Sequence, residues 1–138
     1  ARDLGAVEAL HAGREAEEAV RAATLGHGAD VVLDCVGTAA TCASAIAMVR
    51  KGGRIVVVGY TTDPQDYPVL PTDHVALRQL SILGSRYVTR IELECVIDLA
   101  ARGLIRPVVS EVLDLSRAND ALDRVRNDRV VGRVVLRV

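Results

Sequence analysis

Aromatic residues are what this sequence has least of. Among its 138 residues are three tyrosines and no phenylalanine or tryptophan, although half of the residues are hydrophobic. A core built from this composition must therefore use valine, leucine, isoleucine and alanine. The chain is long enough to bury such a core within one domain.

A charge surplus and long apolar runs are also lacking. Lysine and arginine total 17 against 18 aspartate and glutamate residues, which gives a net charge of −1. This nearly equal number of positive and negative charges favours neither nucleic acid nor a membrane surface as a partner. No apolar run approaches the roughly 20 residues that span a bilayer, and no signal-peptide pattern is present. We therefore expect a cytoplasmic protein that binds neither nucleic acid nor membrane.

The cysteines Cys35, Cys42 and Cys95 are odd in number, and the Cys-x-x-Cys spacing typical of metal sites is absent. All three lie inside apolar patterns, so we expect buried, reduced thiols. No metal site is predicted in this sequence.

The clearest pattern is the run of four β-branched residues from Ile55 to Val58. It has no period-2 alternation and predicts a strand covered on both faces, as in parallel sheets. Gly52 and Gly53 predict the turn that leads into this strand, and Gly59 marks its end. A glycine at the carboxyl end of a central parallel strand allows a ligand to approach the backbone closely. The alternative is a plain buried strand that ends at a turn.

Strands and helices are predicted to alternate along the rest of the chain. The opening, Ala1–Gly5, resembles the last turn of a helix with Gly5 as its C′ residue, and the chain lacks an initiator methionine. We therefore expect it to be a piece of a longer protein. Strands are predicted at Val7–Leu10, Asp30–Val36, Leu80–Ser85, within Pro107–Leu115 and over Val130–Val138, and helices at Arg14–Leu25, from the cap Thr38 through Met48, over Arg90–Arg102 and after the cap Ser116. This order predicts an α/β fold with a parallel sheet and right-handed crossovers.

Five segments, in their order and spacing, resemble the medium-chain zinc-type alcohol dehydrogenase family. Each segment is weakly specific by itself, but together they cover nearly the whole chain. They are Ala1–Ala6, Gly28–Gly37, Lys51–Gly59, Ile82–Ser85 and Gly132–Leu136.

The resemblance implies a partial doubly wound parallel sheet made of Rossmann strands three to six. Residues 1–102 would be the partial NAD(P)-binding domain, and residues 103–138 a β/α tail that returns to a GroES-like catalytic domain. The Gly-x-Gly-x-x-Gly turn and the zinc ligands are expected upstream of Ala1, so zinc is expected only there. With strands one and two absent, we expect Val7–Leu10 to pack irregularly or to pair out of the family order.

The resemblance also implies contacts with the coenzyme. Cys35-Val36-Gly37-Thr38 would flank its adenosine side, and the carbonyl of Val58 and the amide of Tyr60, on either side of Gly59, would hold the nicotinamide carboxamide. The backbone of Ser85-Arg86-Tyr87 would meet the same carboxamide from the other side, and Arg133 would reach the pyrophosphate. Gly59 and Gly84 could instead be simple turn glycines, and Arg133 a surface residue. Asp34 is interpreted as a hydrogen-bonded residue at a strand end rather than a catalytic acid.

The function implied by the resemblance is hydride transfer between an alcohol or carbonyl substrate and NAD or NADP, with NAD favoured. The chain alone is expected to be inactive. The complete enzyme is expected to be a homodimer, or a homotetramer built from it, through the strand near Leu80–Leu83. The alternatives are a zinc-less quinone or enoyl reductase of the same superfamily, and a non-catalytic nucleotide-binding module.

Overall fold

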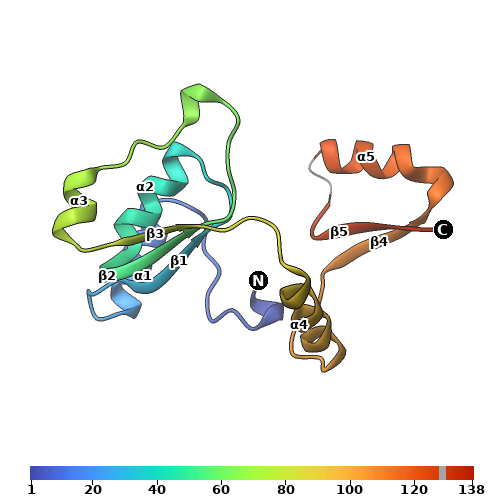
Figure 1. Ribbon diagram of the computed structural model, residues 1–138, viewed down its shortest axis with the longest axis horizontal. Helices are drawn as coiled ribbons and strands as arrows, with labels where there is room; N and C mark the ends of the chain where they lie inside the picture. Colours follow the sequence, from blue (N-terminus) through green and yellow to red (C-terminus); the bar gives the residue numbers. More distant parts are fainter. Residues whose placement is uncertain (128–129) are drawn as a thin grey trace. The chain divides into compact units, whose positions relative to one another are not determined.

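The computed structural model describes residues 1–127 and 130–138, which form two compact α/β units, Ala1–Tyr87 and Val88–Val138 (Figure 1). The boundary predicted between residues 102 and 103 stays a prediction. In the described residues, no helix has both the length and the apolar character that a membrane crossing needs.

The first unit contains a parallel sheet of three strands in the order β1-β2-β3. The strands are β1 (Ala29–Asp34), β2 (Val49–Val57) and β3 (Ser81–Gly84). In the register of the sheet, Val32 lies opposite Ile55, and Ile55 opposite Ile82. The order agrees with that expected for Rossmann strands four to six.

Helix α2 (Ala39–Met48) covers one face of this sheet and forms the core with it (Figure 1). Ala45, Val49 and Ile55 are almost fully buried there. The helix begins where the sequence predicts, because the Thr38 hydroxyl accepts a hydrogen bond from the Thr41 amide in a capping box. Helix α1 (Arg14–Ala23) packs against α2.

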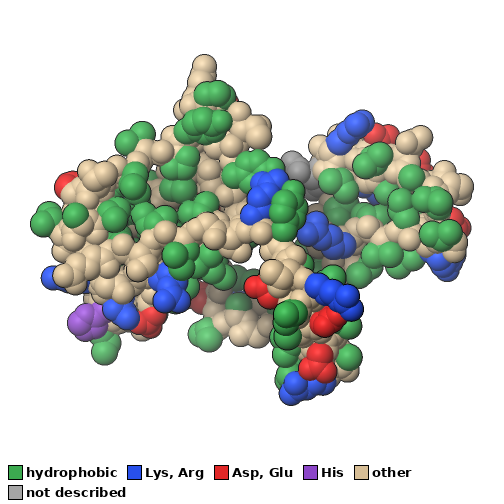
Figure 2. Space-filling model, viewed as in Figure 1, with side chains coloured by type: hydrophobic (Ala, Val, Ile, Leu, Met, Phe, Trp, Pro, Cys, Tyr) green, Lys and Arg blue, Asp and Glu red, His purple; other side chains and the backbone are tan. Residues whose placement is uncertain are grey.

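The other face of the sheet is not covered by any described helix of this unit. Val31 and Leu33, whose side chains alternate with that of Val32, are 49% and 62% exposed. The prediction that the strand Ile55–Val58 is covered on both faces is therefore confirmed only in part, because Ile55 is buried and Val56 and Val57 are partly buried, whereas Val58 is 45% exposed. Apolar side chains are correspondingly frequent on the visible surface (Figure 2).

Gly52 and Gly53 lie inside β2 rather than in a turn before it. The β1–β2 register shifts between the pairs Ala29–Val49 and Val31–Arg54, so the glycines belong to an irregular stretch of the strand. Gly52 has φ 68°, and a Cβ at Gly53 would lie 2.6 Å from Val49 Cγ2. The predicted turn is wrong because this irregular stretch uses the freedom of glycine within a strand.

The segment Val7–Leu10 forms no strand and is exposed, so the predicted strand is wrong, and the segment is paired with no strand of either described sheet. Before it, a 3₁₀ helix over Arg2–Leu4 ends at Gly5 with φ 96°, which confirms the predicted helical turn. Between β2 and β3 lie a 3₁₀ turn at Pro64–Asp66 and the short helix α3 (Thr72–Leu77).

The second unit contains α4, a parallel pair of strands and α5. The elements are α4 (Arg90–Ala101), β4 (Val109–Asp114), α5 (Ala118–Arg126) and β5 (Arg133–Arg137).

Leu113 of β4 and Ala121 of α5 are the buried apolar residues of this unit among those described. Ser116 does not cap α5, because it lies inside a 3₁₀ turn at Leu115–Arg117 that leads directly into the helix. The last strand begins only after Gly132, which has φ 92°.

Candidate functional site

The carboxyl ends of β1, β2 and β3 lie at one edge of the sheet, because the three strands are parallel. The segments that follow them are Cys35–Thr38, Val58–Tyr60 and Ser85–Tyr87. All the predicted site residues except Arg133 therefore lie at this edge, where open α/β sheets bind ligands.

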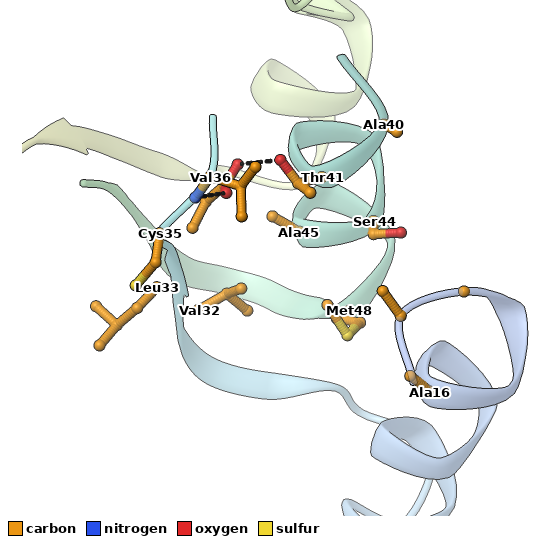
Figure 3. Close-up of a pocket in the computed structure, with 13 residues that line it drawn as sticks. Ala16, Val32, Leu33, Cys35, Val36, Ala40, Thr41, Ser44, Ala45 and Met48 are labelled. Atoms are coloured by element: carbon orange, nitrogen blue, oxygen red, sulfur yellow. Dashed lines mark hydrogen bonds between the residues drawn. The ribbon is translucent and has the colours of Figure 1, made fainter. Parts of the chain in front are cut away.

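Asp34, the last residue of β1, organises the first of these segments. Its side chain is buried, with Oδ1 accepting hydrogen bonds from the amides of Val36 at 3.0 Å and Gly37 at 2.9 Å. Oδ2 accepts from Thr41 Oγ1 at 3.0 Å (Figure 3) and from Cys42 Sγ at 3.1 Å. The interpretation of Asp34 as a hydrogen-bonded strand-end residue is confirmed.

These bonds also set the ionisation of the Asp34 carboxyl. Burial by itself would raise its pKa, but the hydrogen bonds, led by that from the Gly37 amide, outweigh burial and lower the pKa below its ordinary value. Asp34 is therefore a fixed anion that holds a loop and the start of α2, and its carboxylate oxygens are occupied by protein donors.

The cysteines are free thiols, but they are not uniformly buried as predicted. Cys42 is partly buried, and burial and the neighbouring Asp34 carboxylate raise its pKa to about 11, which keeps the thiol protonated. Cys35 and Cys95 are exposed. Cys35 lies just beyond β1 at the edge of the sheet, and Cys95 lies on α4, whose apolar side chains are largely exposed.

The ends of β1 and β2 pack directly against each other through their backbones. The Asp34 carbonyl accepts from the amides of Val58 at 2.8 Å and Gly59 at 3.0 Å. A Cβ at Gly37 would lie 2.1 Å from the Gly59 carbonyl oxygen, and a Cβ at Gly59 would lie 2.2 Å from the Cys35 carbonyl oxygen. Glycine is therefore required at both positions by this backbone contact, and a ligand contact at Gly59 stays a prediction.

Two backbone groups at the end of β2 remain available to a ligand. In the part of the chain that the structure describes, neither the Val58 carbonyl nor the Tyr60 N–H has a hydrogen-bond partner. The nearby Ser85 N–H, in contrast, is used within the sheet and donates to the Val57 carbonyl at 2.9 Å. An acceptor and a donor placed two residues apart are complementary to a primary carboxamide, which offers both kinds of group.

The side chains of Tyr60, Arg86 and Tyr87 form a cluster that the sequence did not predict. The Arg86 guanidinium carbon lies 4.5 Å from the centre of the Tyr60 ring and 4.7 Å from that of Tyr87. Arg86 Nη2 donates to the hydroxyls of Tyr60 at 3.2 Å and Tyr87 at 3.0 Å. These interactions, with the Tyr87 bond first, raise the Arg86 pKa. The signal that could have revealed the cluster is the presence of two of the three tyrosines at neighbouring strand ends.

A cavity of about 470 Å³ lies beside β1, between the amino-terminal end of α1 and α2 (Figure 3). Of the predicted site residues, Cys35 and Val36 line it. The rest of its wall is mostly small and apolar and includes Ala16, Val32 and Ala45. This cavity therefore continues from the predicted adenosine side of the site along the edge strand.

Arg133 belongs to the second unit, where it begins β5 with an exposed side chain. Its amide donates to the Val108 carbonyl at 2.9 Å, so its backbone has a structural role and its predicted contact with a pyrophosphate stays a prediction. Among the described residues, no group of three or more histidine, cysteine, aspartate or glutamate side chains could hold a metal ion.

The chain is similar to known dehydrogenases over most of its length. A family model described as zinc-binding dehydrogenase matches residues 1–102. The chain is 36% identical over 127 residues to an NAD-dependent alcohol dehydrogenase of Sulfolobus acidocaldarius, covering 88% of this chain and 35% of that protein. It is 33% identical over 107 residues to an acryloyl-coenzyme A reductase of Metallosphaera sedula, covering 78% of this chain and 32% of that protein.

Solved structures agree with this similarity. The alcohol dehydrogenase of Aeropyrum pernix matches with a TM-score of 0.83 and 32% identity, covering 98% of this chain and 38% of that one. The α/β fold thus resembles the Rossmann-type part of alcohol dehydrogenases. The chain spans about a third of the length of the relatives it matches.

Proposed function

Because the chain belongs to the zinc-binding dehydrogenase family, we propose that it is the coenzyme-binding part of an NAD-dependent oxidoreductase acting on an alcohol or its carbonyl product. The relative named above as an NAD-dependent alcohol dehydrogenase supports this assignment. It also favours NAD over NADP.

The observation that carries the proposal is the free pair formed by the Val58 carbonyl and the Tyr60 N–H. In the proposed complex the carbonyl accepts from the carboxamide nitrogen of the nicotinamide, and the N–H donates to its oxygen. The Ser85–Tyr87 backbone would face the same group. The coenzyme supplies hydride chemistry when bound, and these residues fix the orientation of its nicotinamide ring.

The residues around Asp34 would contact the adenosine side of the coenzyme. The Asp34 carboxylate holds the amides of Val36 and Gly37 in place, so the backbone of Cys35–Thr38 presents a fixed surface to the coenzyme. Arg133 is proposed to reach the pyrophosphate, for which a planar guanidinium is well suited. The proposal assigns zinc no ligand within the described residues.

A second candidate reaction is the reduction of an activated carbon–carbon double bond. The similarity to an acryloyl-coenzyme A reductase supports it, and the coenzyme-binding role of this chain would be the same. Zinc content distinguishes an alcohol dehydrogenase of the zinc type from a zinc-less enoyl reductase. A non-catalytic nucleotide-binding module is the third possibility, and any turnover of nicotinamide coenzyme would exclude it.

The test uses the complete protein that carries this chain. We expect calorimetry to show NADH binding in the micromolar range, and we expect NADH oxidation with either an aldehyde series or acryloyl-coenzyme A. A folded protein that binds no NADH at millimolar concentration would refute the proposal.

A further inference from the structure

The Arg86 guanidinium is held by aromatic groups and has no anionic partner. No carboxylate lies within salt-bridge distance of it among the described residues. Other arginines of this unit bond a carboxylate or a backbone carbonyl instead, as Arg14 does with Glu18 and Arg21 with the Ala47 carbonyl. A cation without a counter-ion at the ligand-binding edge of the sheet is a candidate recognition group.

The contacts of Arg86 leave a usable set of donors. Two of its five N–H groups, both on Nη2, point to the tyrosine hydroxyls. Neither Nε nor Nη1 has a hydrogen-bond partner among the described residues. The two rings restrict the orientation of the guanidinium plane but leave these donors free. The arginine is therefore already ordered before a ligand binds, and binding loses less conformational entropy.

The backbone at this cluster is also unusual. Tyr87 has φ 57°, in the left-handed region that residues other than glycine rarely adopt. Such a conformation is costly and is often found at functional sites. In this conformation the Tyr87 ring lies against the guanidinium of the neighbouring Arg86.

We propose that Tyr60, Arg86 and Tyr87 form a binding site for an oxyanion, a carboxylate or a phosphate, carried by the substrate. This site rests on the proposed function, since Tyr60 contributes its N–H to the nicotinamide carboxamide and its ring to the cluster. Arg86 therefore lies beside the nicotinamide end of the coenzyme, whereas the coenzyme's own phosphates are separated from that end by a ribose. The substrates selected would be alcohols or carbonyl compounds that bear a negative charge.

The experiment titrates acetate and, separately, inorganic phosphate into the complete protein, with methyl acetate, which has neither a charge nor an amide N–H, as the neutral probe. Ring ¹³C resonances of Tyr60 and Tyr87, assigned with tyrosine-to-phenylalanine variants, report binding. We expect saturable shifts with the anions and none with methyl acetate. Arg86→Lys keeps the charge but loses the planar fork, and should weaken anion binding about tenfold or more.

Arg54→Lys is the matched control, because Arg54 is an exposed arginine with no ring contact or carboxylate partner among the described residues. It should leave anion binding unchanged. Absence of an anion response, or equal weakening by Arg54→Lys and Arg86→Lys, would overturn the proposal.

A second arm repeats the titration with saturating NADH and decides the source of the oxyanion. Unchanged anion affinity supports a substrate group, and displacement of the anion by NADH assigns Arg86 to a coenzyme phosphate and overturns the substrate assignment. A protein that binds anions but no NADH would refute the proposed function, and the first arm would still decide whether the anion site exists.

Discussion

Replacement of Asp34 should destabilise the site edge more than any exposed substitution in the first unit. In Asp34→Ala the buried Gly37 amide and the neighbouring Val36 amide both lose their acceptor. Leaving a buried donor unpaired costs roughly 1–3 kcal/mol. Some water will reach the Val36 amide, so we expect the free energy of unfolding to fall by about 2–4 kcal/mol.

Asp34→Asn separates hydrogen bonding from charge. The asparagine oxygen can still accept from both amides, while its nitrogen donates to the Thr41 hydroxyl, which now acts as acceptor. We therefore expect a loss of only about 1 kcal/mol at neutral pH, from the weaker neutral bonds.

The pH dependence has a definite sign. The Asp34 pKa is lowered in the folded state, so its stabilising contribution is present above the ordinary carboxyl range and is lost as the pH falls through the lowered folded-state pKa. The stability difference between the wild type and Asp34→Asn should therefore shrink as the solution is acidified below about pH 4.

Hydrogen exchange of the Val36 and Gly37 amides, together with thermal melting, measures these effects. Asp63→Ala is the matched control, because Asp63 accepts from the Gln65 amide in an exposed turn, and its loss should cost no more than about 1 kcal/mol. Unchanged protection of both amides in Asp34→Ala, with a stability loss below about 0.5 kcal/mol, would refute this account of the loop.

Three further outcomes are expected. Gly37→Ala should lower stability by more than about 2 kcal/mol, because its Cβ would strike the Gly59 carbonyl and its φ is 76°; a melting temperature equal to wild type would contradict this. Cys42 should react with thiol reagents far more slowly than Cys35 at pH 8, because its pKa is raised to about 11; equal rates by mass spectrometry would count against it. The complete protein should be a dimer or tetramer through the exposed edge strand β3, and a strictly monomeric mass by light scattering would refute that.

The parts of the fold that the sequence predicted depend on local chemistry. Thr38 caps α2 through bonds to a residue three positions away, and Gly5 ends a helical turn through its own positive φ. The interpretation of Asp34 succeeded for a related reason, since its partners Val36, Gly37, Thr41 and Cys42 all lie within eight positions.

The parts that the sequence did not predict depend on contacts between distant segments. A run such as Ile55–Val58 indicates a buried strand, but only the neighbouring elements decide whether one face or two are covered. Gly52 and Gly53 carry the same turn signal whether they precede a strand or distort one. The cluster of Tyr60 and Arg86 joins residues 26 positions apart, and no periodicity in the sequence reports such a contact.

The central claim is that backbone groups at the end of β2 hold the nicotinamide carboxamide. The most direct test is the NADH dissociation constant of the complete protein with Tyr60→Pro, beside Tyr60→Val and wild type. Proline removes the N–H, and the unpaired carboxamide oxygen should weaken binding by roughly 1–3 kcal/mol, about five- to a hundred-fold or more. Valine keeps the N–H and should change the constant little. With both variants shown to be folded by their melting curves, equal weakening by valine and proline would contradict the claim.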